Sequence, residues 1–276
     1  MSFAQRLPLF KLNDDGIYIL DIQSEVNYPN DGNQFCFSLE EKSYWFKHRN
    51  NCIISLINKF PPSGRILDIG GGNGFVSQRI QKEGYPISLL EPGEVGARNA
   101  KNIREIDEVI NCTFEDAKFP NDYLDNVGLF DVLEHIEDDG EFLKRIWSVL
   151  KPNGYVYATL PAYNSIWSYS DDHAEHFRRY NKKKIKSLLG GSFSLQYFSY
   201  FFSALLFPTI LFRTFPYRIG RKKKGVLSSD SEFGITGGIL SNLISKVLDL
   251  ELKYLQSGKN ILVGTSCLCV LEKIDE

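Results

Sequence analysis

A glycine-rich stretch, Arg65 to Phe75 (RILDIGGGNGF), constrains the fold of this chain more than any other feature. Its first five residues are mostly apolar and β-prone, glycines follow at positions 70, 71, 72 and 74, and a helix is expected to begin near Phe75. Glycine has no Cβ, so the backbone can adopt a positive φ and lie directly against a ligand at the helix N-terminus. The stretch therefore predicts a strand, a turn and a helix that together hold a cofactor.

Strand and helix patterns alternate from this turn to about Pro161. We expect strands at 87–90, 109–113, 126–133 and 155–160, and helices at 75–83, 94–104 and 138–150. Such alternation with short connections predicts right-handed βαβ units and a parallel sheet that is covered by helices on both faces. Farther along we expect a helix at 182–189, a strand at 194–202, a helix at 239–252 and a final strand at 260–271.

This pattern divides the chain into four segments. Residues 1–37 form an N-terminal extension with a hairpin, because Asp15 and Gly16 separate two β-prone runs. Residues 38–207 form the α/β core, which opens with a helix at 38–60 that Ser38 is expected to cap. Residues 208–258 are expected to be an insertion or lid over the carboxyl edges of the strands, and residues 259–276 return the chain to the sheet.

Charge and cysteine content narrow the class of protein. A net charge of −2 argues against binding of duplex nucleic acid, which usually requires a strongly basic surface. The five cysteines are scattered without a CxxC pair, which is typical of a reduced intracellular chain and not of a zinc site. The first residues, MSFAQRLPLFKL, lack the apolar run of a secretory signal, so we expect a cytoplasmic protein.

The spacing of the glycines decides which cofactor the turn holds. A dinucleotide-binding turn has the pattern GxGxxG, with glycine at the sixth position. Counted from Gly70 or from Gly72, the sixth position is Phe75 or Ser77. The glycine spacing therefore excludes the dinucleotide pattern.

The spacing that is present is Asp-x-Gly-x-Gly-x-Gly, and with it the chain resembles class I S-adenosylmethionine-dependent methyltransferases. Later stretches match the family in order: Glu91 ends the second strand, Asp116 lies in FEDAKFP, FDVLEHIEDD begins at Phe130, and LKPNGYVYATLPA begins at Leu150. The resemblance implies S-adenosylmethionine as the cofactor and a Rossmann-like seven-stranded sheet whose last strand is antiparallel. It also implies that Glu91 accepts hydrogen bonds from the ribose hydroxyls and Asp116 from the adenine amino group. The implied cofactor-binding residues are Asp68, Gly70, Gly72, Gly74, Glu91, Asp116 and Phe130.

Histidines are the first candidates on the acceptor side. Methyl transfer needs an aligned nucleophile and exclusion of water, and an oxygen nucleophile also benefits from a base, which is usually histidine. Of the four histidines, His135 ends the fourth strand and His176 follows the fifth, so both can reach the edge where open α/β sheets bind ligands. We predict His176 first and His135 second as the base or acceptor contact.

Two arginines follow in the same segment. Arg178 and Arg179 either grip a phosphate or carboxylate of the acceptor, or pair with Glu175 or Asp172 and fix the loop. We include Arg179 among the catalytic candidates. The segment resembles a Gly-His-x-Arg-Arg-Tyr stretch of methyltransferases encoded beside glycan and lipid pathways, with Glu175 in place of the glycine.

An apolar run at 201–215 precedes basic residues at 218 and 221–224. The run is too short for a membrane-spanning helix, which needs ~20 apolar residues. It is expected either to form a lid over an apolar substrate or to make peripheral contact, through residues 201–224, with the inner face of the membrane. Both readings suggest a hydrophobic or lipid-linked substrate. We predict methyl transfer to a small-molecule or lipid-linked acceptor, with oxygen as the preferred atom.

Two other functions stay open. Asp131, Glu134, His135 and His176 are similar to the Glu-x-x-Glu-His and later His of metal-dependent RNA 3′-terminal 2′-O-methyltransferases, with Asp131 in place of the first glutamate. Ubiquinone-type O-methyltransferases carry a similar Leu-Glu-His, so we favour that small-molecule branch and assign no metal ligand. The other alternative is a non-catalytic cofactor-binding protein or membrane scaffold.

Overall fold

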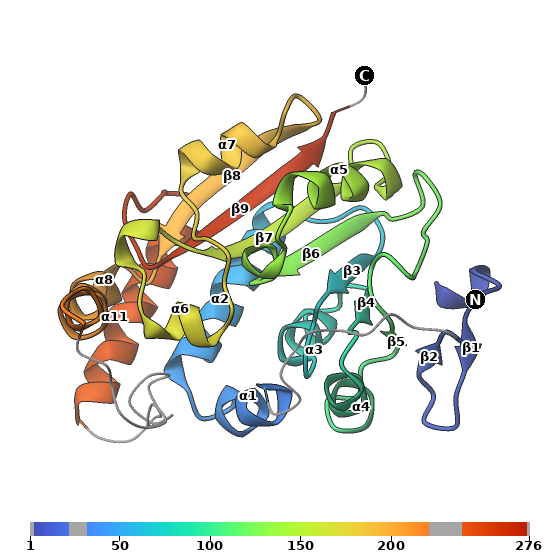
Figure 1. Cartoon of the computed structure of the whole chain (residues 1–276), viewed down its shortest axis with the longest axis horizontal. Coiled ribbons are helices and arrows are strands. Elements are labelled where there is room, and N and C mark those ends of the chain that lie inside the picture. The colour runs from blue at the N-terminus through green and yellow to red at the C-terminus, as the bar shows by residue number, and fades with distance from the viewer. Residues whose placement is uncertain (1–2, 22–31, 221–238, 275–276) are drawn as a thin grey trace.

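A nine-stranded sheet forms the centre of the computed structural model, which describes residues 3–21, 32–220 and 239–274 (Figure 1). The order of the strands is β1-β2-β5-β4-β3-β6-β7-β9-β8. The strands are β1 Lys11–Leu12, β2 Tyr18–Ile19, β3 Ile66–Ile69, β4 Ile87–Leu90, β5 Val109–Asn111, β6 Asn126–Phe130, β7 Tyr155–Pro161, β8 Phe193–Phe201 and β9 Ser266–Lys273.

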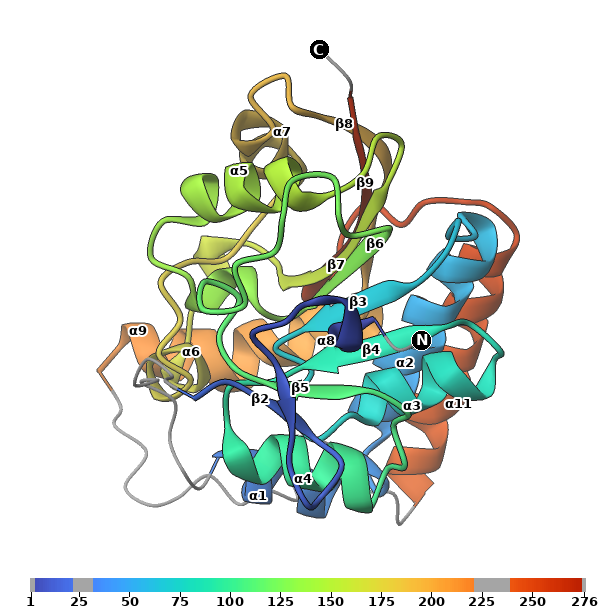
Figure 2. The ribbon, with the colours of Figure 1, turned by 90° about the vertical axis from the view of Figure 1, so that its right-hand side faces the viewer.

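The strands β5-β4-β3-β6-β7-β9-β8, in this order across the sheet, form the predicted seven-stranded Rossmann-like sheet. β3 pairs in parallel with both β4 and β6, so the order of the strands reverses at β3. The last strand, β9, runs antiparallel between β7 and β8, as expected. The additional strands belong to the predicted N-terminal hairpin, β1 and β2, which extends the sheet beside β5 (Figure 2).

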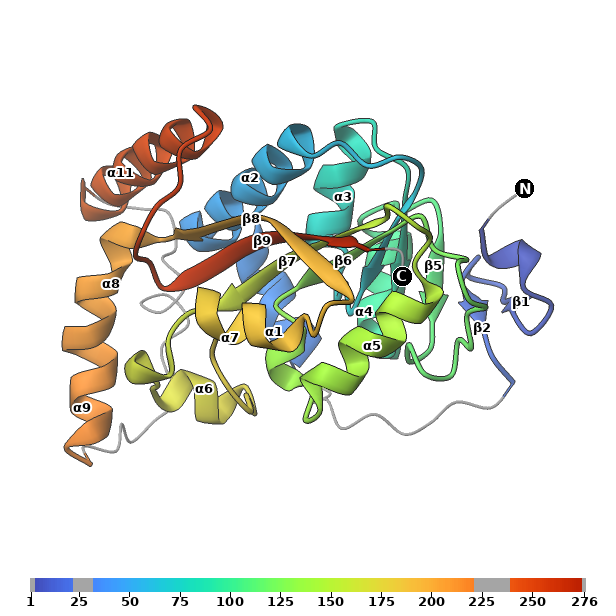
Figure 3. The same ribbon diagram turned by 90° about the horizontal axis from the view of Figure 1, so that it is seen from above.

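Helices cover both faces of the sheet. α2, α3, α4 and α11 pack on one face, and α5 and α7 pack on the other (Figure 3). The helices are η1 Ala4–Arg6, α1 Gly32–Glu40, α2 Tyr44–Lys59, α3 Phe75–Lys82, α4 Glu94–Asn102, η2 Leu133–His135, α5 Asp139–Val149, η3 Asn164–Ile166, α6 Tyr169–His173, α7 Lys182–Leu188, α8 Ser203–Thr209, η4 Ile210–Thr214, α9 Phe215–Arg218 and α11 Ile239–Gln256.

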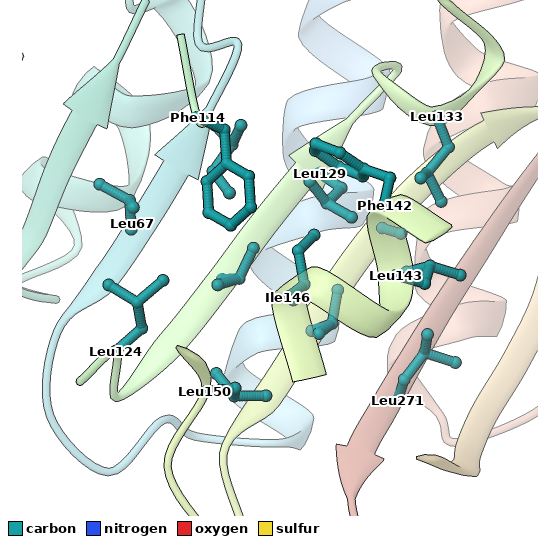
Figure 4. Close-up of a cluster of buried hydrophobic side chains, with 14 of the residues drawn as sticks. Leu67, Phe114, Leu124, Leu129, Leu133, Phe142, Leu143, Ile146, Leu150 and Leu271 are labelled. Atoms are coloured by element: carbon teal, nitrogen blue, oxygen red, sulfur yellow. The ribbon is translucent and has the colours of Figure 1, made fainter. Parts of the chain in front are cut away.

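The largest buried cluster lies between the sheet and α5. Phe142, Leu143 and Ile146 of α5 belong to the same cluster as Leu67 of β3 and Leu129 of β6 (Figure 4). Full burial of one such side chain stabilises the fold by about 1.5–3 kcal/mol. This packing fixes β3 and β6 relative to each other, and therefore fixes the loops that follow them.

The prediction of one helix at 38–60 with Ser38 as its cap was wrong. Ser38 lies inside α1, and a separate helix, α2, begins at Tyr44. Ser43 has an extended backbone, and its hydroxyl accepts hydrogen bonds from the N–H groups of Trp45 (3.0 Å) and Phe46 (3.4 Å). Ser43 therefore does what was expected of Ser38, because serine satisfies the free N–H groups of a first helical turn.

The insertion also differs from its expected form. Pro208, a residue type that usually interrupts a helix, lies inside α8, which continues through the π-helical segment η4 into α9. The last strand begins at Ser266 and not at residue 260. The basic run at 221–224 and the Gly/Ser-rich linker at 225–238 lie outside the described residues. Among the helices that the structure describes, none is long and apolar enough to span a bilayer.

Candidate active site

The glycine turn lies between β3 and α3, at the carboxyl edge of the sheet. Gly70, Gly72 and Gly74 have φ values of 68°, 55° and 78°, which side-chain-bearing residues rarely adopt. A Cβ added at Gly71 would lie 2.7 Å from the side chain of Leu89, and one at Gly74 would lie 2.9 Å from Cβ of Ala100. The turn therefore requires glycine both for its conformation and for its packing, and its backbone forms the cradle.

Glu91 joins this turn to the loop after β4. Its carboxylate is buried, with one oxygen 2.8 Å from the N–H of Gly72 and the other 2.8 Å from the N–H of Gly93. Each oxygen of a carboxylate can accept more than one hydrogen bond. Contact with ribose hydroxyls remains a prediction, but Glu91 also has a role in holding the cradle together.

Asp68 is buried beneath the turn. One of its oxygens accepts a hydrogen bond from the Ser77 hydroxyl at 2.5 Å, whereas Oδ1 has no partner within the described part of the chain. Burial raises the pKa of Asp68 to about 7, although Ser77 and Arg49 favour the charged form. A buried oxygen without a partner, beside a turn that admits no Cβ at Gly71 or Gly74, fits a site built to receive a polar group of a cofactor.

The other two predicted cofactor residues lie at the same edge. Asp116 is half-buried in the loop after β5, and its N–H donates to the Thr113 hydroxyl at 3.0 Å. Phe130 ends β6, but its ring packs in the cluster beneath α2, and its carbonyl accepts a hydrogen bond from Arg49 at 3.3 Å. The ring of Phe130 is therefore part of the core, and contact between Phe130 and a cofactor stays a prediction.

The predicted catalytic residues His135 and His176 lie together. Their ring centroids are 4.8 Å apart and the rings are nearly perpendicular, at 80°. Nδ1 of His176 lies 3.0 Å from Oδ1 of Asp171, a fully buried carboxylate. When Nδ1 donates to Asp171, the neutral ring keeps Nε2 as its proton acceptor.

Asp171 organises the loop. Nε and Nη2 of Arg179 donate to its two oxygens at 2.6 and 3.0 Å, and the N–H of Ser168 donates to Oδ2 at 2.8 Å. Burial opposes ionisation, but the hydrogen bonds from His176 and Arg179 and the charge of Arg179 outweigh it, so the pKa of Asp171 falls to about 2. Asp171 is therefore a permanent anion at neutral pH.

Arg178 and Arg179 form ion pairs that fix the loop, but Glu175 and Asp172 were the wrong partners to expect. Arg179 pairs with Asp171 and donates to the carbonyl of Ala162 at 3.2 Å. Arg178 donates to the carbonyl of Ile136 at 2.7 Å and lies 3.2 Å from the carboxylate of Asp139. Neither Glu175 nor Asp172 takes part in these contacts, and both guanidinium groups hold the loop in this conformation.

A second acidic group lies beside the histidines. Glu134 is buried, its Oε2 has no partner among the described residues, and burial together with the charge of Asp131 raises its pKa well above the usual range. Ligand atoms of Glu134, His135 and His176 lie within 4.8 Å of one another. Burial and the neighbouring His176 lower the pKa of His135 to about 4, so this ring is neutral at pH 7 and keeps a nitrogen able to bind a cation.

Asp131 has a left-handed backbone conformation, which residues other than glycine rarely adopt. It follows β6, the strand beside β3 where the strand order reverses, and has a φ of 61°. Nε of Arg49, on α2, lies 2.8 Å from Oδ2 of Asp131, as an ion pair whose N–H does not point at the carboxylate. Sequence patterns gave no reason to select Arg49 or Asp171, although the Ser168-x-x-Asp171 spacing is that of a capping box and could have indicated the latter.

Comparison with known proteins supports this reading of the fold. Residues 45–192 match the model of a family described as "Methyltransferase domain". The ubiquinone biosynthesis O-methyltransferase of Bradyrhizobium diazoefficiens is 32% identical over 93 residues, which cover 33% of this chain and 37% of that protein. A ubiquinone/menaquinone biosynthesis C-methyltransferase of Vibrio vulnificus is 27% identical over 103 residues, covering 34% and 39%. The chain thus matches little more than a third of the length of these curated relatives.

Solved structures share the fold at lower identity. Phosphoethanolamine N-methyltransferase 2 of Haemonchus contortus, in complex with S-adenosylhomocysteine, aligns with a TM-score of 0.56 and 15% identity over 91% of this chain and 58% of its own. An S-adenosylmethionine-dependent methyltransferase of Archaeoglobus fulgidus aligns with a TM-score of 0.52 and 18% identity over 86% and 99%. From the family match, the sheet order and the glycine turn, we conclude that the chain belongs to the class I S-adenosylmethionine-dependent methyltransferases.

Proposed function

We propose that this protein transfers a methyl group from S-adenosylmethionine to a hydroxyl of a small-molecule or lipid-linked acceptor, with His176 as the general base. The observation that carries the proposal is the contact between His176 and the buried carboxylate of Asp171, at the edge that holds the glycine turn. When bound, the cofactor supplies a methyl group on a positively charged sulfur, which is already an activated leaving group. The glycine turn, Asp68, Glu91 and Asp116 would hold it.

His176 is preferred over His135 on chemical grounds. Asp171 fixes the ring of His176 through Nδ1 and stabilises the imidazolium that forms when Nε2 takes the proton of the acceptor hydroxyl. His135 has a pKa of about 4, so it accepts a proton weakly at neutral pH. Arg179 acts through Asp171, because its two donors hold both carboxylate oxygens. We therefore assign Arg179 as a positioning residue.

The class of acceptor rests on the relatives and on the surface near the site. The named relatives include enzymes of ubiquinone biosynthesis and a 2-methyl-6-phytyl-1,4-hydroquinone methyltransferase, whose name describes a phenol with a long hydrocarbon tail. The segment α8, η4 and α9 carries exposed apolar side chains that could meet such a tail, and it contacts α6, the helix that contains Asp171. These features favour a phenolic hydroxyl on an apolar molecule, and methylation at oxygen is the finer part of the proposal.

The test is a methylation screen read by mass spectrometry. Purified full-length protein is mixed with S-adenosylmethionine and, separately, with a catechol, a catechol carrying an isoprenoid tail, and phosphoethanolamine. We expect S-adenosylhomocysteine and an O-methyl ether from the tailed catechol. Methylation at carbon or only of the amine would contradict the proposed oxygen chemistry, and formation of no product from any phenol would contradict the acceptor class.

A matched pair of variants tests the base. His176→Ala should lower turnover by about 100-fold while S-adenosylhomocysteine still binds, because general-base catalysis is lost and the cradle is untouched. His173→Ala, at an exposed histidine of α6, is the control and should keep full turnover. If both variants keep turnover, His176 is not the base. If the unmodified protein binds cofactor without any turnover, the scaffold alternative is favoured.

The cluster of Glu134, His135 and His176 favours a second candidate, a metal-dependent methyltransferase of the RNA 3′-terminal type. A divalent ion bound there would polarise the acceptor hydroxyl, and mixed nitrogen and oxygen ligands suit Mg²⁺, Mn²⁺ or Zn²⁺. Metal analysis of the purified protein and of Glu134→Gln separates the two candidates. The metal enzyme is favoured if the protein binds about one ion per chain and methylates the 2′-hydroxyl of an RNA end, and if Glu134→Gln loses both properties. If the purified protein contains no metal ion, the metal-dependent candidate is excluded.

A further inference from the structure

Exposed apolar side chains are concentrated in one part of the molecule. Of the eighteen large apolar side chains that are exposed in the described residues, twelve lie between positions 207 and 263. They belong to the segment α8–η4–α9, to α11, and to the loop before β9. They are Phe207, Ile210, Leu211, Phe212, Phe215, Ile219, Leu243, Val247, Leu250, Tyr254, Leu262 and Val263. Such a concentration is unusual, because scattered single exposures are the norm and gathered ones mark an interaction surface.

The segment α8–η4–α9, residues 203–218, forms a rod at the rim of the molecule (Figure 3). Phe207, Phe212 and Phe215 are 72%, 65% and 57% exposed. In contrast, Thr214 is buried and its hydroxyl donates to the carbonyl of Ile166 at 3.0 Å. The rod is thus attached to the protein along one side, and its phenylalanines lie on the surface.

The contacts of the rod lead toward the active site. The ring of Tyr217 lies edge-on to Tyr169, with centroids 4.6 Å apart, and Nη2 of Arg218 donates to the carbonyl of Ser165 at 2.7 Å. Tyr169 opens α6, the short helix that contains Asp171. The rod therefore lies against the loop that holds His176.

Charge favours one occupant for this surface. Residues 201–224 contain six arginines and lysines and no aspartate or glutamate, although the whole chain has a net charge of −2. A second copy of the chain would bring the same basic segment against itself if it paired through a two-fold axis. A membrane interface with anionic headgroups complements both the basic residues and the exposed phenylalanines, and interfacial helices combine these two features.

We propose that the rod, residues 203–218, lies in the interface of an anionic membrane with Phe207, Phe212 and Phe215 inserted among the acyl chains. The residues that follow the rod in the sequence, Arg221 to Lys224, add positive charge that favours anionic headgroups. A protein held this way presents the Asp171 and His176 loop next to the bilayer. Vesicle binding is measured without cofactor or acceptor, so its outcome is separate from that of the proposed reaction.

The experiment is co-sedimentation of the purified full-length protein with vesicles. Vesicles of phosphatidylcholine with about 30% phosphatidylserine are compared with vesicles of phosphatidylcholine alone. We expect binding to the anionic vesicles that weakens as salt is raised, because the headgroup attraction is screened. The combined variant Phe207→Ser, Phe212→Ser and Phe215→Ser should bind at least about 10-fold more weakly, since apolar insertion is lost.

Two further variants make the result specific. Changing Arg221, Lys222, Lys223 and Lys224 to glutamine should reduce binding to anionic vesicles to the level seen with phosphatidylcholine. The control, Val95→Ser with Ile103→Ser, alters side chains of α4 and its end that are 45% and 52% exposed, and should bind as the unmodified protein does. Equal melting temperatures show that the variants are folded.

Three outcomes would overturn the proposal. The first is no binding to anionic vesicles. The second is unchanged binding by the triple phenylalanine variant. The third is a dimer in solution that this variant dissociates, because that result would assign the surface to a second copy of the chain.

Discussion

The two carboxylate oxygens of Asp171 contact the side chains of both His176 and Arg179, so this residue orients the two side chains together. Oδ1 faces both Nδ1 of His176 and Nε of Arg179, whereas Oδ2 accepts from Nη2 of Arg179 and from the N–H of Ser168. An asparagine at 171 has one oxygen, so it cannot accept from all of these donors. It would also carry no charge to stabilise an imidazolium at His176.

We therefore expect Asp171→Asn to lower kcat by about 100-fold and to leave KM for the acceptor and the affinity for S-adenosylhomocysteine within about twofold. Steady-state kinetics and calorimetric titration of S-adenosylhomocysteine measure the two effects. The control is Asp172→Asn, at the exposed neighbour whose carboxylate accepts from the Trp167 indole at 2.7 Å. A matching loss of cofactor affinity in Asp171→Asn would mean that the residue only supports the local fold.

At this scale the sequence predicted which histidines lie together better than it predicted the hydrogen-bond partners of the arginines. His135 and His176 were placed at one edge because both follow parallel strands, and their rings do lie 4.8 Å apart. The partner of Arg179 could not be predicted, since three nearby acids in one short loop are equivalent until the loop conformation is known. In the structure the three acids differ in burial. Asp171, which pairs with Arg179, is fully buried, whereas Asp172 and Glu175 are exposed.

Among the elements, the N-terminus of α8 is capped by a side chain from another helix. Glu251 of α11 accepts hydrogen bonds from the N–H groups of Phe202 (2.6 Å) and Ser203 (2.7 Å), and so caps α8 from outside it. The same carboxylate lies 2.9 Å from Nε2 of His48, on α2. Burial opposes ionisation of Glu251, but the hydrogen bonds from His48 and Ser203 outweigh it and lower its pKa below the usual value of 4.5.

We expect Glu251→Ala to lower the free energy of unfolding by about 3 kcal/mol at pH 7, because buried N–H groups and His48 lose their partner. A lowered pKa means that the carboxylate stabilises the fold above the usual pKa of 4.5, and that this stabilisation is lost as the pH falls below it. The deficit of the variant should therefore shrink in acid. Urea unfolding at several pH values measures it, with Asp249→Ala, at an exposed acid of α11, as the control. A deficit that does not change with pH would contradict the cap.

The elements also show which patterns carry information about structure. The strands of the core were predicted because their burial produces mostly apolar runs, as in β4 and β6, where every residue is buried. The ends of helices were predicted less well. Ser38 and Ser43 are equally good caps by composition, and the choice depends on the packing of α1. Pro208 did not end its helix, and an apolar sequence alone does not reveal that.

For the whole molecule, the cofactor cradle joins the turn after β3 to the loop after β4, and binding of the cofactor there should stabilise the entire fold. A ligand at about 100 times its dissociation constant adds about 2.7 kcal/mol to the free energy of unfolding, which corresponds to a rise in Tm of roughly 5–10 °C for a domain of this size. We expect this rise with S-adenosylhomocysteine and none with NAD, because the glycine spacing lacks the dinucleotide pattern.

Glu91→Gln should remove most of the rise, since one oxygen replaces the two that hold Gly72 and Gly93. Glu94→Gln, at an exposed position of α4, should keep it. Differential scanning fluorimetry measures all four cases, and equal protection by NAD would contradict the assignment of the turn.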